Sequence, residues 1–405
     1  MRFRTLRFFA LVAGMLAAPV SRADDRPLKV FILAGQSNMQ GHAHVRTLEH
    51  LAMDPDMAPL LLEIQNADGT PRVHEDVWMS YLTDHGVKQG NLSTGFGADE
   101  NKLGPELTFG IRMQKSLQEP ILIIKTAWGG KSLHTDFRPP SAGPFEFTAD
   151  QLEQFRKQGR DPTAIRAEKD QATGQAYRAM LEHVRNVLAD IRHVDPDYDP
   201  QAGYELAGFV WFQGWNDMVD GGVYPQRDQP GGYDQYSVLL AHLIRDVRRD
   251  LAAPDLPFVI GVLGVGGPVD EYGPEQQRYK ATHQNFRLAM AAPANLPEFQ
   301  GTVANVLTED CWDRELSALQ QRVAKLKQKI KQSTQGQQLE PPAIHRLEAQ
   351  ARTEEFTARE LETLEKGISN FEFHYLGSAK IMTCIGQRFA AAMLELRRNK
   401  SSTRE

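Results

Sequence analysis

A serine follows an apolar run near the start of the chain. Residues 30–33 are all apolar, and Gly35-Gln36-Ser37-Asn38-Met39 comes directly after them. The run predicts a buried strand, which would hold Ser37 on rigid backbone beside a small residue that leaves room for a substrate. A serine hydroxyl is a weak nucleophile until a base and an oxyanion site surround it. An ordinary strand-to-loop turn is the alternative, so the choice depends on what else the chain carries.

Two later segments also place glycine after an apolar run. In the first, Trp128 is followed by Gly129 and Gly130, where a backbone N–H can approach a substrate oxygen closely. In the second, Gln213-Gly214-Trp215-Asn216-Asp217 follows an apolar run. The amide of Asn216 could donate to an oxyanion, although capping a helix is a frequent alternative for asparagine.

A histidine late in the chain, His374, stands just before a predicted helix and could act as the base. A merely exposed or structurally hydrogen-bonded ring is the alternative, since the chain contains 12 histidines. The close pair in His42-Ala43-His44 lacks an accompanying acidic or cysteine cluster, so we interpret it as a loop and predict no metal site. The chain has no phosphate-binding glycine loop that would support nucleotide chemistry.

The elements that must position these residues alternate between strands and helices. This alternation predicts an α/β fold of three layers, with a mainly parallel sheet between helices. In such sheets the sites lie at the carboxyl ends of strands, where Ser37, Gly129-Gly130 and Gln213-Gly214 all fall. The predicted strands are Leu28–Leu33, Ile121–Ala127, Leu206–Phe212, Phe258–Leu263 and Thr302–Val306. The predicted helices are Glu106–Leu117, Gln171–Ile191, Gln235–Leu251, Gln277–Met290 and Ser378–Arg398.

Three stretches depart from this alternation. Residues 313–367 carry a heptad seam (Leu316, Leu319, Val323, Leu326, Ile330), a break at Ser333–Pro342 and a second charged helical stretch. We interpret them as an inserted helical hairpin that packs on itself or on the body, with a dimerisation arm as the alternative. Glu75–Leu103 and Thr135–Asp161 are expected to be long loops of functional importance.

The first 23 residues have the layout of a secretory signal peptide. A basic start, an apolar stretch from Phe8 to Val20 and small residues up to Ala23 form that layout, and the apolar stretch is short for a membrane span. We therefore expect a soluble secreted or periplasmic protein whose single domain covers residues 24–398. Removing residues 1–23 removes four arginines and no acids, so the formal charge changes from −6 to −10. That charge gives no electrostatic case for binding nucleic acid or an anionic membrane. Cys311 and Cys384 could pair in an oxidising compartment.

Taken together, the four segments resemble the SGNH hydrolases, most closely the sialate O-acetylesterase-like and acetylxylan-esterase-like carbohydrate esterases. Gly35-Gln36-Ser37-Asn38-Met39 is similar to their nucleophile block, and the order of Ser37, Gly130, Asn216 and His374 agrees with theirs. The resemblance spans about residues 28–395 without the hairpin. It implies an SGNH or flavodoxin-like fold, Ser37 and His374 as catalytic residues, oxyanion donors at Gly129, Gly130 and Asn216, and no cofactor or metal. As candidate substrate-binding residues we take Gln36, Gln213 and Trp215.

The chain departs from the family at the triad acid. The family usually has aspartate three residues before the histidine, where this chain has Phe371. On an extended segment residues two apart face the same side, so Glu372 could orient the ring of His374. Asp217 is the alternative acid, and Asp310 and Asp313 are further candidates. An enzyme that lacks the acid can still retain considerable catalysis.

The predicted function is that of a secreted serine esterase that removes O-acetyl groups from carbohydrates, such as sialic acids or xylan, through an acyl-enzyme. The acetylated carbohydrate comes from the resemblance alone. A secreted carbohydrate-binding protein with a degenerate triad, and an esterase for non-sugar esters, are the alternatives. Trp128, Trp211 and Trp215 favour sugars, although tryptophans are equally common as core residues. The identity of the glycan and the oligomeric state, which depends on the hairpin, stay open.

Overall fold

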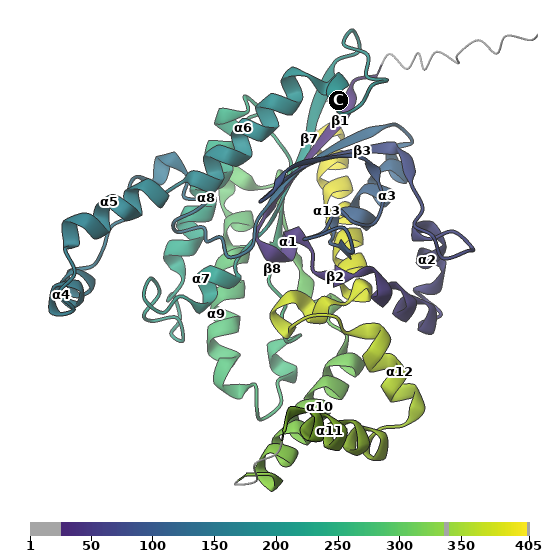
Figure 1. Ribbon diagram of the computed structural model, residues 1–405. Coiled ribbons are helices and arrows are strands. Elements are labelled where there is room, and N and C mark those ends of the chain that lie inside the picture. The colour runs from purple at the N-terminus through teal and green to yellow at the C-terminus, as the bar shows by residue number, and fades with distance from the viewer. Residues whose placement is uncertain (1–25, 336–339, 403–405) are drawn as a thin grey trace, which may run out of the picture.

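A seven-stranded sheet forms the centre of the molecule in the computed structural model, which describes residues 26–335 and 340–402 (Figure 1). The strand order is β4-β3-β6-β1-β7-β8-β9, and all neighbours pair in parallel except β3 and β4. The strands are β1 (Leu28–Gly35), β3 (His74–Thr83), β4 (Gly86–Leu92), β6 (Ile121–Ala127), β7 (Tyr204–Phe212), β8 (Phe258–Val262) and β9 (Val303–Leu307). A separate two-stranded sheet joins β2 (Ala43–His44) and β5 (Lys102–Leu103).

The predicted α/β fold with a mainly parallel sheet is confirmed. All five apolar runs form strands of the sheet, and β6 is buried along its whole length, as continuous Ile and Leu residues between two helical layers require. Strand β1 lies in the middle, between β6 and β7. The register sets Gly35 beside Ala127 and Phe212, so three neighbouring strands end at the same level.

Helices cover both faces of the sheet. Helices α3 (Glu106–Leu117) and α13 (Ala379–Ser402) pack together on one face, and α6 (Gln175–Ala189) and α8 (Asp234–Asp250) cover the other, with α9 (Lys280–Ala291) beside α8 (Figure 1). The remaining α-helices are α1 (Ser37–Gln40), α2 (Ala58–Ile64), α4 (Ala149–Lys157), α5 (Pro162–Ala172), α7 (Trp215–Val219), α10 (Arg314–Ser333), α11 (Pro341–Glu355) and α12 (Ala358–Gly367). The 3₁₀ turns are η1 (Val45–Met53), η2 (Pro140–Ala142), η3 (Ile191–His193), η4 (Val269–Glu271), η5 (Gln277–Tyr279), η6 (Ala292–Asn295), η7 (Pro297–Phe299), η8 (Thr308–Cys311) and η9 (Glu372–Gly377).

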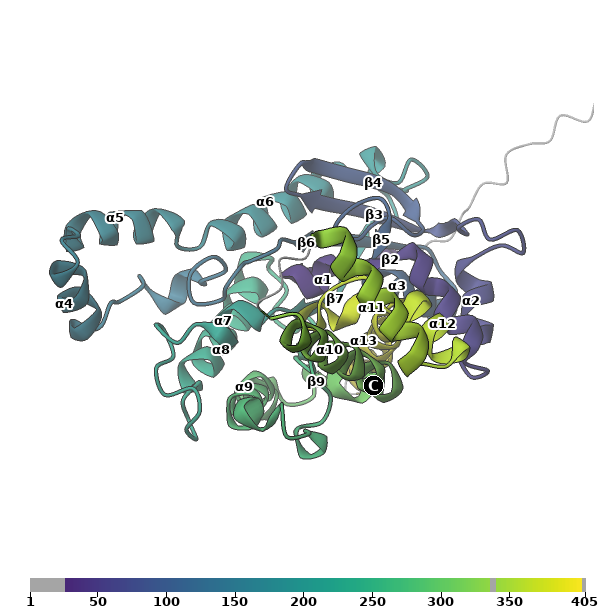
Figure 2. The same cartoon turned by 60° about the horizontal axis from the view of Figure 1, so that its bottom comes forward.

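Of the two stretches expected to be long loops, Glu75–Leu103 is mostly strand, whereas Thr135–Asp161 is irregular up to Phe147 apart from η2 and becomes helical at α4. Most of Glu75–Leu103 lies in the β3–β4 hairpin, in which polar residues interrupt the apolar ones and leave no apolar run longer than Val77-Trp78-Met79. Within Thr135–Asp161, Thr148 begins α4 with a capping box, and α5 follows. Helices α4 and α5 extend away from the body as an arm (Figure 2). The polar, charged surfaces of these helices gave no apolar stripe that sequence reasoning could recognise.

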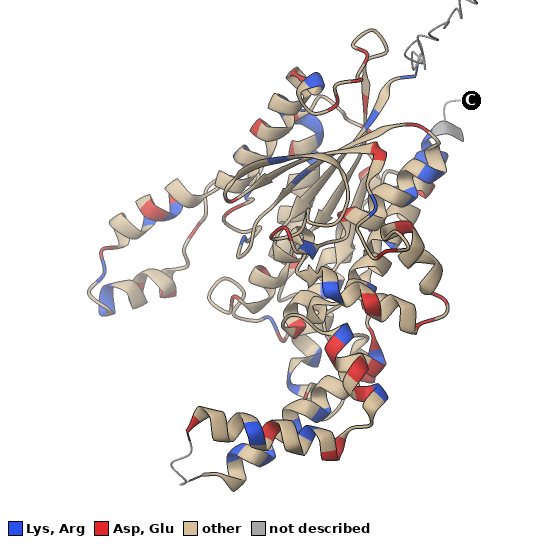
Figure 3. Ribbon diagram, turned by 45° about the vertical axis from the view of Figure 1, so that its right-hand side comes forward, with Lys and Arg blue, Asp and Glu red and all other residues tan. Residues whose placement is uncertain are grey.

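The insertion at residues 313–367 contains three helices, where two helical stretches were predicted. Helices α11 and α12 are separated at Phe356 and Thr357, and Thr357 caps α12. A small apolar core of its own unites Leu319, Val323, Phe356 and Leu364. Lysines, arginines and acidic residues are interspersed over the outer surface of these helices (Figure 3). The insertion thus buries the middle of its seam internally, while Leu316 joins the core of the body and α12 contacts η1.

A disulfide joins Cys311 to Cys384, with a Cα–Cα distance of 5.7 Å. It links η8, which follows β9, to α13, and therefore closes a loop that contains the whole helical insertion. Within the described residues, no helix is both long enough and apolar enough to cross a membrane. The predicted signal peptide, residues 1–23, lies outside the described residues.

Candidate active site

Ser37 lies where β1 passes into α1, and glycine is required two residues earlier, at position 35. A Cβ atom on Gly35 would stand 2.1 Å from the carbonyl oxygen of Phe212, so the end of β1 approaches β7 too closely for any side chain. The N–H of Gln36 donates to the same carbonyl, which fixes the turn. Ser37 is 7% exposed. The predicted placement of this hydroxyl at the tip of a buried strand therefore has a direct steric cause.

The surroundings of Ser37 contain polar groups that no protein group satisfies. The Ser37 hydroxyl donates to Oε1 of Gln36, which is fully buried. Nε2 of Gln36 and both amide atoms of Asn38 are buried and lack a hydrogen-bond partner among the described residues. Buried polar atoms are usually paired, so these three atoms are exceptions that can still form hydrogen bonds. Gln36 lies beneath the nucleophile and contacts its hydroxyl.

His374 is oriented by an asparagine. Its Nδ1 lies 3.0 Å from Oδ1 of Asn370, and the backbone N–H of Phe371 donates to the same Oδ1 at 2.8 Å. Because the Phe371 N–H needs an acceptor, the oxygen of the amide must face these two groups, which requires a proton on Nδ1 of His374. The lone pair then sits on Nε2, the nitrogen that a general base needs free.

The backbone that carries His374 is held in an uncommon conformation. Tyr375, Leu376 and Gly377 have φ values of 53°, 60° and 58°, a run of three residues in the left-handed region. Such residues persist only where the surroundings fix them. The buried hydroxyl of Tyr375 accepts from the N–H of Gly264 at 2.8 Å and contacts Oγ1 of Thr308 at 2.6 Å. The carbonyl of Leu376 accepts from two backbone N–H groups, those of Ser369 and Asn370.

The ring of His42 stacks on that of His374, with centroids 4.0 Å apart and planes 4° from parallel. Burial, followed by the charge of Lys102, lowers the pKa of His374 to about 4. Burial, followed by the charge of His374, lowers the pKa of His42 to about 3. Both rings are therefore neutral near pH 7. His42 belongs to the segment that we interpreted as a loop. It lies beside His374 because β2, which follows it, packs against η9.

Glu372, the predicted acid, does not contact His374. The segment is a 3₁₀ turn in which the N–H of His374 donates to the carbonyl of Phe371, so residues two apart do not face the same side. Glu372 points instead into a neighbouring hollow. The expectation failed because it assumed an extended chain.

Asp217, the alternative acid, is bonded to the segment after β6 and to Gln213 and Tyr224. It is fully buried, and its carboxylate accepts hydrogen bonds from two backbone N–H groups, those of Leu133 and His134, at 2.8 and 3.1 Å. It also accepts from Nε2 of Gln213 at 2.6 Å and from the hydroxyl of Tyr224 at 3.1 Å. The remaining acids are engaged elsewhere: Asp310 pairs with Arg388, and Asp313 caps α10.

Gly129, Gly130 and Asn216 lie at the same edge of the sheet as Ser37. The two glycines form an exposed turn after β6, in which Gly130 has a φ of 76°, and the N–H of Trp128 donates to the carbonyl of Gly35. Asn216 is half-buried in α7, and its amide has no hydrogen-bond partner among the described residues. Backbone and amide donors are thus available beside the turn that holds the nucleophile.

Gln213 and Trp215, the two other candidate substrate-binding residues, differ in burial and in their contacts. Gln213 is fully buried, and its amide donates to Lys131 and Asp217 and accepts from Tyr236. These partners occupy both ends of the amide, so the structure gives Gln213 a structural role instead of contact with substrate. Trp215 is half-buried and packs on Phe373, with ring centroids 5.5 Å apart.

A buried ion pair beneath the site was missed in the sequence. Nζ of Lys125 lies 2.8 Å from Oε2 of Glu106, and both side chains are fully buried. Nζ also donates to the carbonyls of Gln40, the last residue of α1, and Phe96. Burial lowers the pKa of Lys125, and Glu106 opposes that change. A lysine inside the apolar run Ile121–Ala127 was the available signal, because a buried lysine needs partners.

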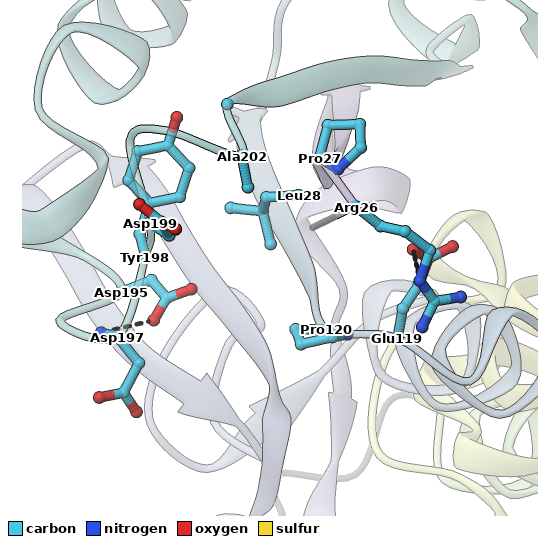
Figure 4. A pocket seen from close by; sticks show the side chains of 11 residues that line it. Arg26, Pro27, Leu28, Glu119, Pro120, Asp195, Asp197, Tyr198, Asp199 and Ala202 are labelled. Atoms are coloured by element: carbon cyan, nitrogen blue, oxygen red, sulfur yellow. Dashed lines mark hydrogen bonds and ion pairs between the residues drawn. The ribbon is translucent and has the colours of Figure 1, made fainter. Parts of the chain in front are cut away.

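One small cavity lies at the opposite edge of the sheet. It measures about 60 Å³ and is lined by residues at the amino ends of the central strands, including Leu28, Pro120 and Asp195 (Figure 4). It contains none of the candidate catalytic residues. Among the described residues no cluster of three or more histidine, cysteine or acidic side chains is arranged to hold a metal ion.

Residues 27–294 match the family of carbohydrate esterases described as sialic acid-specific acetylesterases. The chain belongs to this family. The match includes Ser37, Gly130 and Asn216 and ends before His374, so the family match does not bear on the candidate base.

Solved structures that match the chain include a protein from Arabidopsis thaliana and a carbohydrate acetylesterase from Xanthomonas citri. The first is 15% identical, has a TM-score of 0.37, and covers 70% of this chain and 86% of its own. The second is 16% identical, has a TM-score of 0.40, and covers 70% of this chain and 51% of its own. No curated protein sequence matches the chain.

Proposed function

We propose that this carbohydrate esterase family member is an exported serine esterase that removes O-acetyl groups from carbohydrates. The observation that carries the proposal is the orientation of His374, whose Nδ1 faces Asn370 and whose Nε2 is therefore left as the proton acceptor. Ser37 lies on α1, which contacts the η9 turn that bears His374. Export, with cleavage after Ala23, rests on the signal-peptide pattern of the sequence.

The reaction proceeds in two acyl-transfer steps. Nε2 of His374 accepts the proton of the Ser37 hydroxyl while Oγ attacks the ester carbonyl, and the carbonyl oxygen becomes an oxyanion. The N–H groups of Ser37 and Gly130 and the amide of Asn216 stabilise that oxyanion. When the intermediate collapses, the sugar leaves as an alcohol with the proton from His374. Water then attacks the acetyl-serine through the same base, and acetate is released.

Ser37 first has to turn away from Gln36. Its hydroxyl donates to Oε1 of Gln36 and forms no hydrogen bond with His374 in the described structure. Rotation about one side-chain bond moves the hydroxyl between partners, and hydrogen bonds of catalytic groups often tighten only when the substrate is bound. Oε1 of Gln36 therefore acts as a resting partner for the nucleophile.

Hydrolysis of 4-nitrophenyl acetate tests the esterase activity. We expect wild-type protein to hydrolyse it and Ser37→Ala to lose on the order of 10⁴-fold or more in kcat. Ser93→Ala is the matched control, because the Ser93 hydroxyl bonds to the carbonyl of Arg72 outside the site. Turnover that is absent in wild type, or that survives in Ser37→Ala, overturns the proposal. Acetylated xylan, sialic acids and pectin then identify the natural ester.

A carbohydrate-binding protein without catalysis is the second candidate. The observation in its favour is the lack of a carboxylate next to His374, where Asn370 stands instead. Such a protein would bind the glycan without Ser37-dependent release of acetate, so the same assay separates the two functions. An esterase for non-sugar esters would hydrolyse simple esters but would show no preference for acetylated sugars.

A further inference from the structure

A hollow of about 560 Å³ lies beside the candidate active site. Its walls come from α7, the end of β8, the η5 turn with the start of α9, and η9. Two of its lining residues, Trp215 and Phe373, directly precede Asn216 and His374 in the chain. The hollow is therefore continuous with the segments that carry the oxyanion donor and the base, and its volume is in the range of small-molecule sites.

Aromatic rings form two walls of the hollow. Trp215 and Phe373 pack at 5.5 Å with planes 30° apart, and Phe373 in turn meets the ring of His374 at 4.5 Å. Across the hollow, Tyr279 stacks on His283 with centroids 5.8 Å apart. Flat aromatic faces present apolar surface, which suits the C–H faces of a pyranose ring.

The inner end of the hollow is fixed by hydrogen bonds. The hydroxyl of Tyr272 lies 2.6 Å from Nδ1 of His283 and donates to the carbonyl of Val265. Arg287 contacts that hydroxyl and also the carbonyls of Val265 and Gly267. Burial, followed by the charge of Arg287, lowers the pKa of His283 to about 4, so the ring of His283 is neutral near pH 7. The hollow is a pre-formed feature with a rigid floor.

Two charged side chains line the hollow without a hydrogen-bond or ion-pair partner among the described residues. Glu372 and Arg278 both line it, and neither forms a hydrogen bond or an ion pair with any described residue. The guanidinium of Arg278 lies over the ring of Tyr279, 4.6 Å from its centre. Glu372 keeps an open face toward solvent, yet the surrounding protein desolvates its carboxylate and raises its pKa. A carboxylate accepts and a guanidinium donates hydrogen bonds, which together match the hydroxyl groups of a sugar.

We infer that this hollow binds the sugar portion of the ester, a pyranose that lies against Trp215 and Phe373 and hydrogen-bonds to Glu372 and Arg278. The inference rests on the proposed function and assigns the residues that select the alcohol part of the substrate. An acetyl group on that ring then reaches the carboxyl edge of the sheet beside Asn216 and His374.

The test compares two substrates in the same variants. The ratio of kcat/KM for an O-acetylated monosaccharide to kcat/KM for 4-nitrophenyl acetate measures recognition of the sugar. We expect the ratio to fall at least tenfold in Glu372→Ala and in Arg278→Ala. Lys280→Ala is the matched control, because Lys280 pairs with Asp270 and does not line the hollow. A ratio that stays at the wild-type value in both Glu372→Ala and Arg278→Ala overturns the inference.

A binding measurement separates this inference from the proposed function. Calorimetry with Ser37→Ala and the free, unacetylated monosaccharide requires no catalysis. We expect binding that weakens at least tenfold when Arg278→Ala is added and persists when Lys280→Ala is added. If wild type lacks esterase activity but this binding pattern holds, the proposed function fails and the sugar site stands. Binding that is insensitive to Arg278→Ala overturns the sugar site even where the esterase activity is present.

Discussion

Asn370 takes the place next to His374 that a carboxylate was expected to fill. The family pattern has the acid three residues before the histidine, at the position of Phe371, and we predicted Glu372 as its substitute. The 3₁₀ turn from Phe371 to His374 curls the chain, so the residue four positions before the histidine is the one that faces its ring. Sequence reasoning selected His374 as the candidate base but did not find Asn370 as its partner, because that contact depends on local backbone geometry that no residue pattern encoded.

Changing Asn370 tests its role as a positioning residue. Asn370→Ala removes the acceptor of the Nδ1 proton, a hydrogen bond worth about 1.5–3 kcal/mol when the imidazolium forms, so kcat should fall roughly ten- to hundredfold. Asn370→Asp keeps the acceptor and adds a negative charge, which should raise the pKa of His374. Unlike Asn370→Ala, this variant should therefore keep its activity at neutral pH. Steady-state rates with 4-nitrophenyl acetate over a range of pH measure both effects. Asn370→Ala with wild-type rates would remove Asn370 from the mechanism.

The low pKa of His374 predicts activity that extends into acid. The base acts in its neutral form, so kcat/KM should rise as pH increases through about 4 and then level off. An unperturbed histidine would place this rise near pH 6.5. Lys102→Ala removes a positive charge that lowers this pKa, and should therefore shift the acid limb to higher pH. A wild-type midpoint near 6.5 would contradict the buried environment of His374.

At the scale of elements, the helical insertion is joined to the body through η1. Arg46 of η1 donates to the carbonyl of Ile368 at the end of α12, and Lys366 pairs with Glu49. The heptad seam predicted the helix α10 and its packing, but the break between α11 and α12 was not visible in the charged stretch. A dimerisation arm stays a prediction, which light scattering of the purified protein would test.

The Cys311–Cys384 disulfide should make a large contribution to stability. It closes a loop with a sequence separation of 73 residues. In the chain-entropy description, such a cross-link stabilises the native state by about 4 kcal/mol, chiefly by restricting the unfolded chain. We expect the Cys311→Ser, Cys384→Ser double variant to lose about 2–5 kcal/mol of unfolding free energy in urea denaturation. Wild type measured with and without reductant is the control, and equal stability in all three samples would contradict this prediction.

Across the whole molecule, the sheet could be predicted far better than the surface elements around it. Buried strands such as β6 consist of continuous apolar residues, which the sequence displays directly. Strand order, the β3–β4 hairpin and the α4–α5 arm depend on contacts between distant residues or on half-exposed patterns. The same division holds within the site: Ser37 and the glycines follow strands, whereas Asn370, His42 and the Lys125–Glu106 pair come together only through tertiary packing.

Export makes a prediction about the mature chain. If residues 1–23 direct secretion, protein recovered from the periplasm or medium should begin at Asp24, because the small residues up to Ala23 fit the cleavage site. Intact mass and N-terminal sequencing of the exported protein measure this. Replacing Leu11 and Leu16 with aspartate should hold the chain inside the cell, since charge interrupts the apolar stretch. Exported protein that retains residues 1–23 would contradict a cleaved signal.

The tyrosine that anchors the base has a consequence for the order in which the chain becomes reactive. Tyr375 fixes the turn of His374 by reaching Gly264 and Thr308, at the ends of β8 and β9. His374 follows Ser37 by more than 330 residues, so Ser37 leaves the ribosome well before His374 and Tyr375. If Ser37 and His374 form the proposed pair, the growing chain cannot form an acyl-serine by this mechanism until His374 has been synthesised. Loss of the C-terminal region from residue 374 onward would remove the proposed base and also α13, which covers one face of the sheet, so hydrolytic activity and the packing of the core should be lost together.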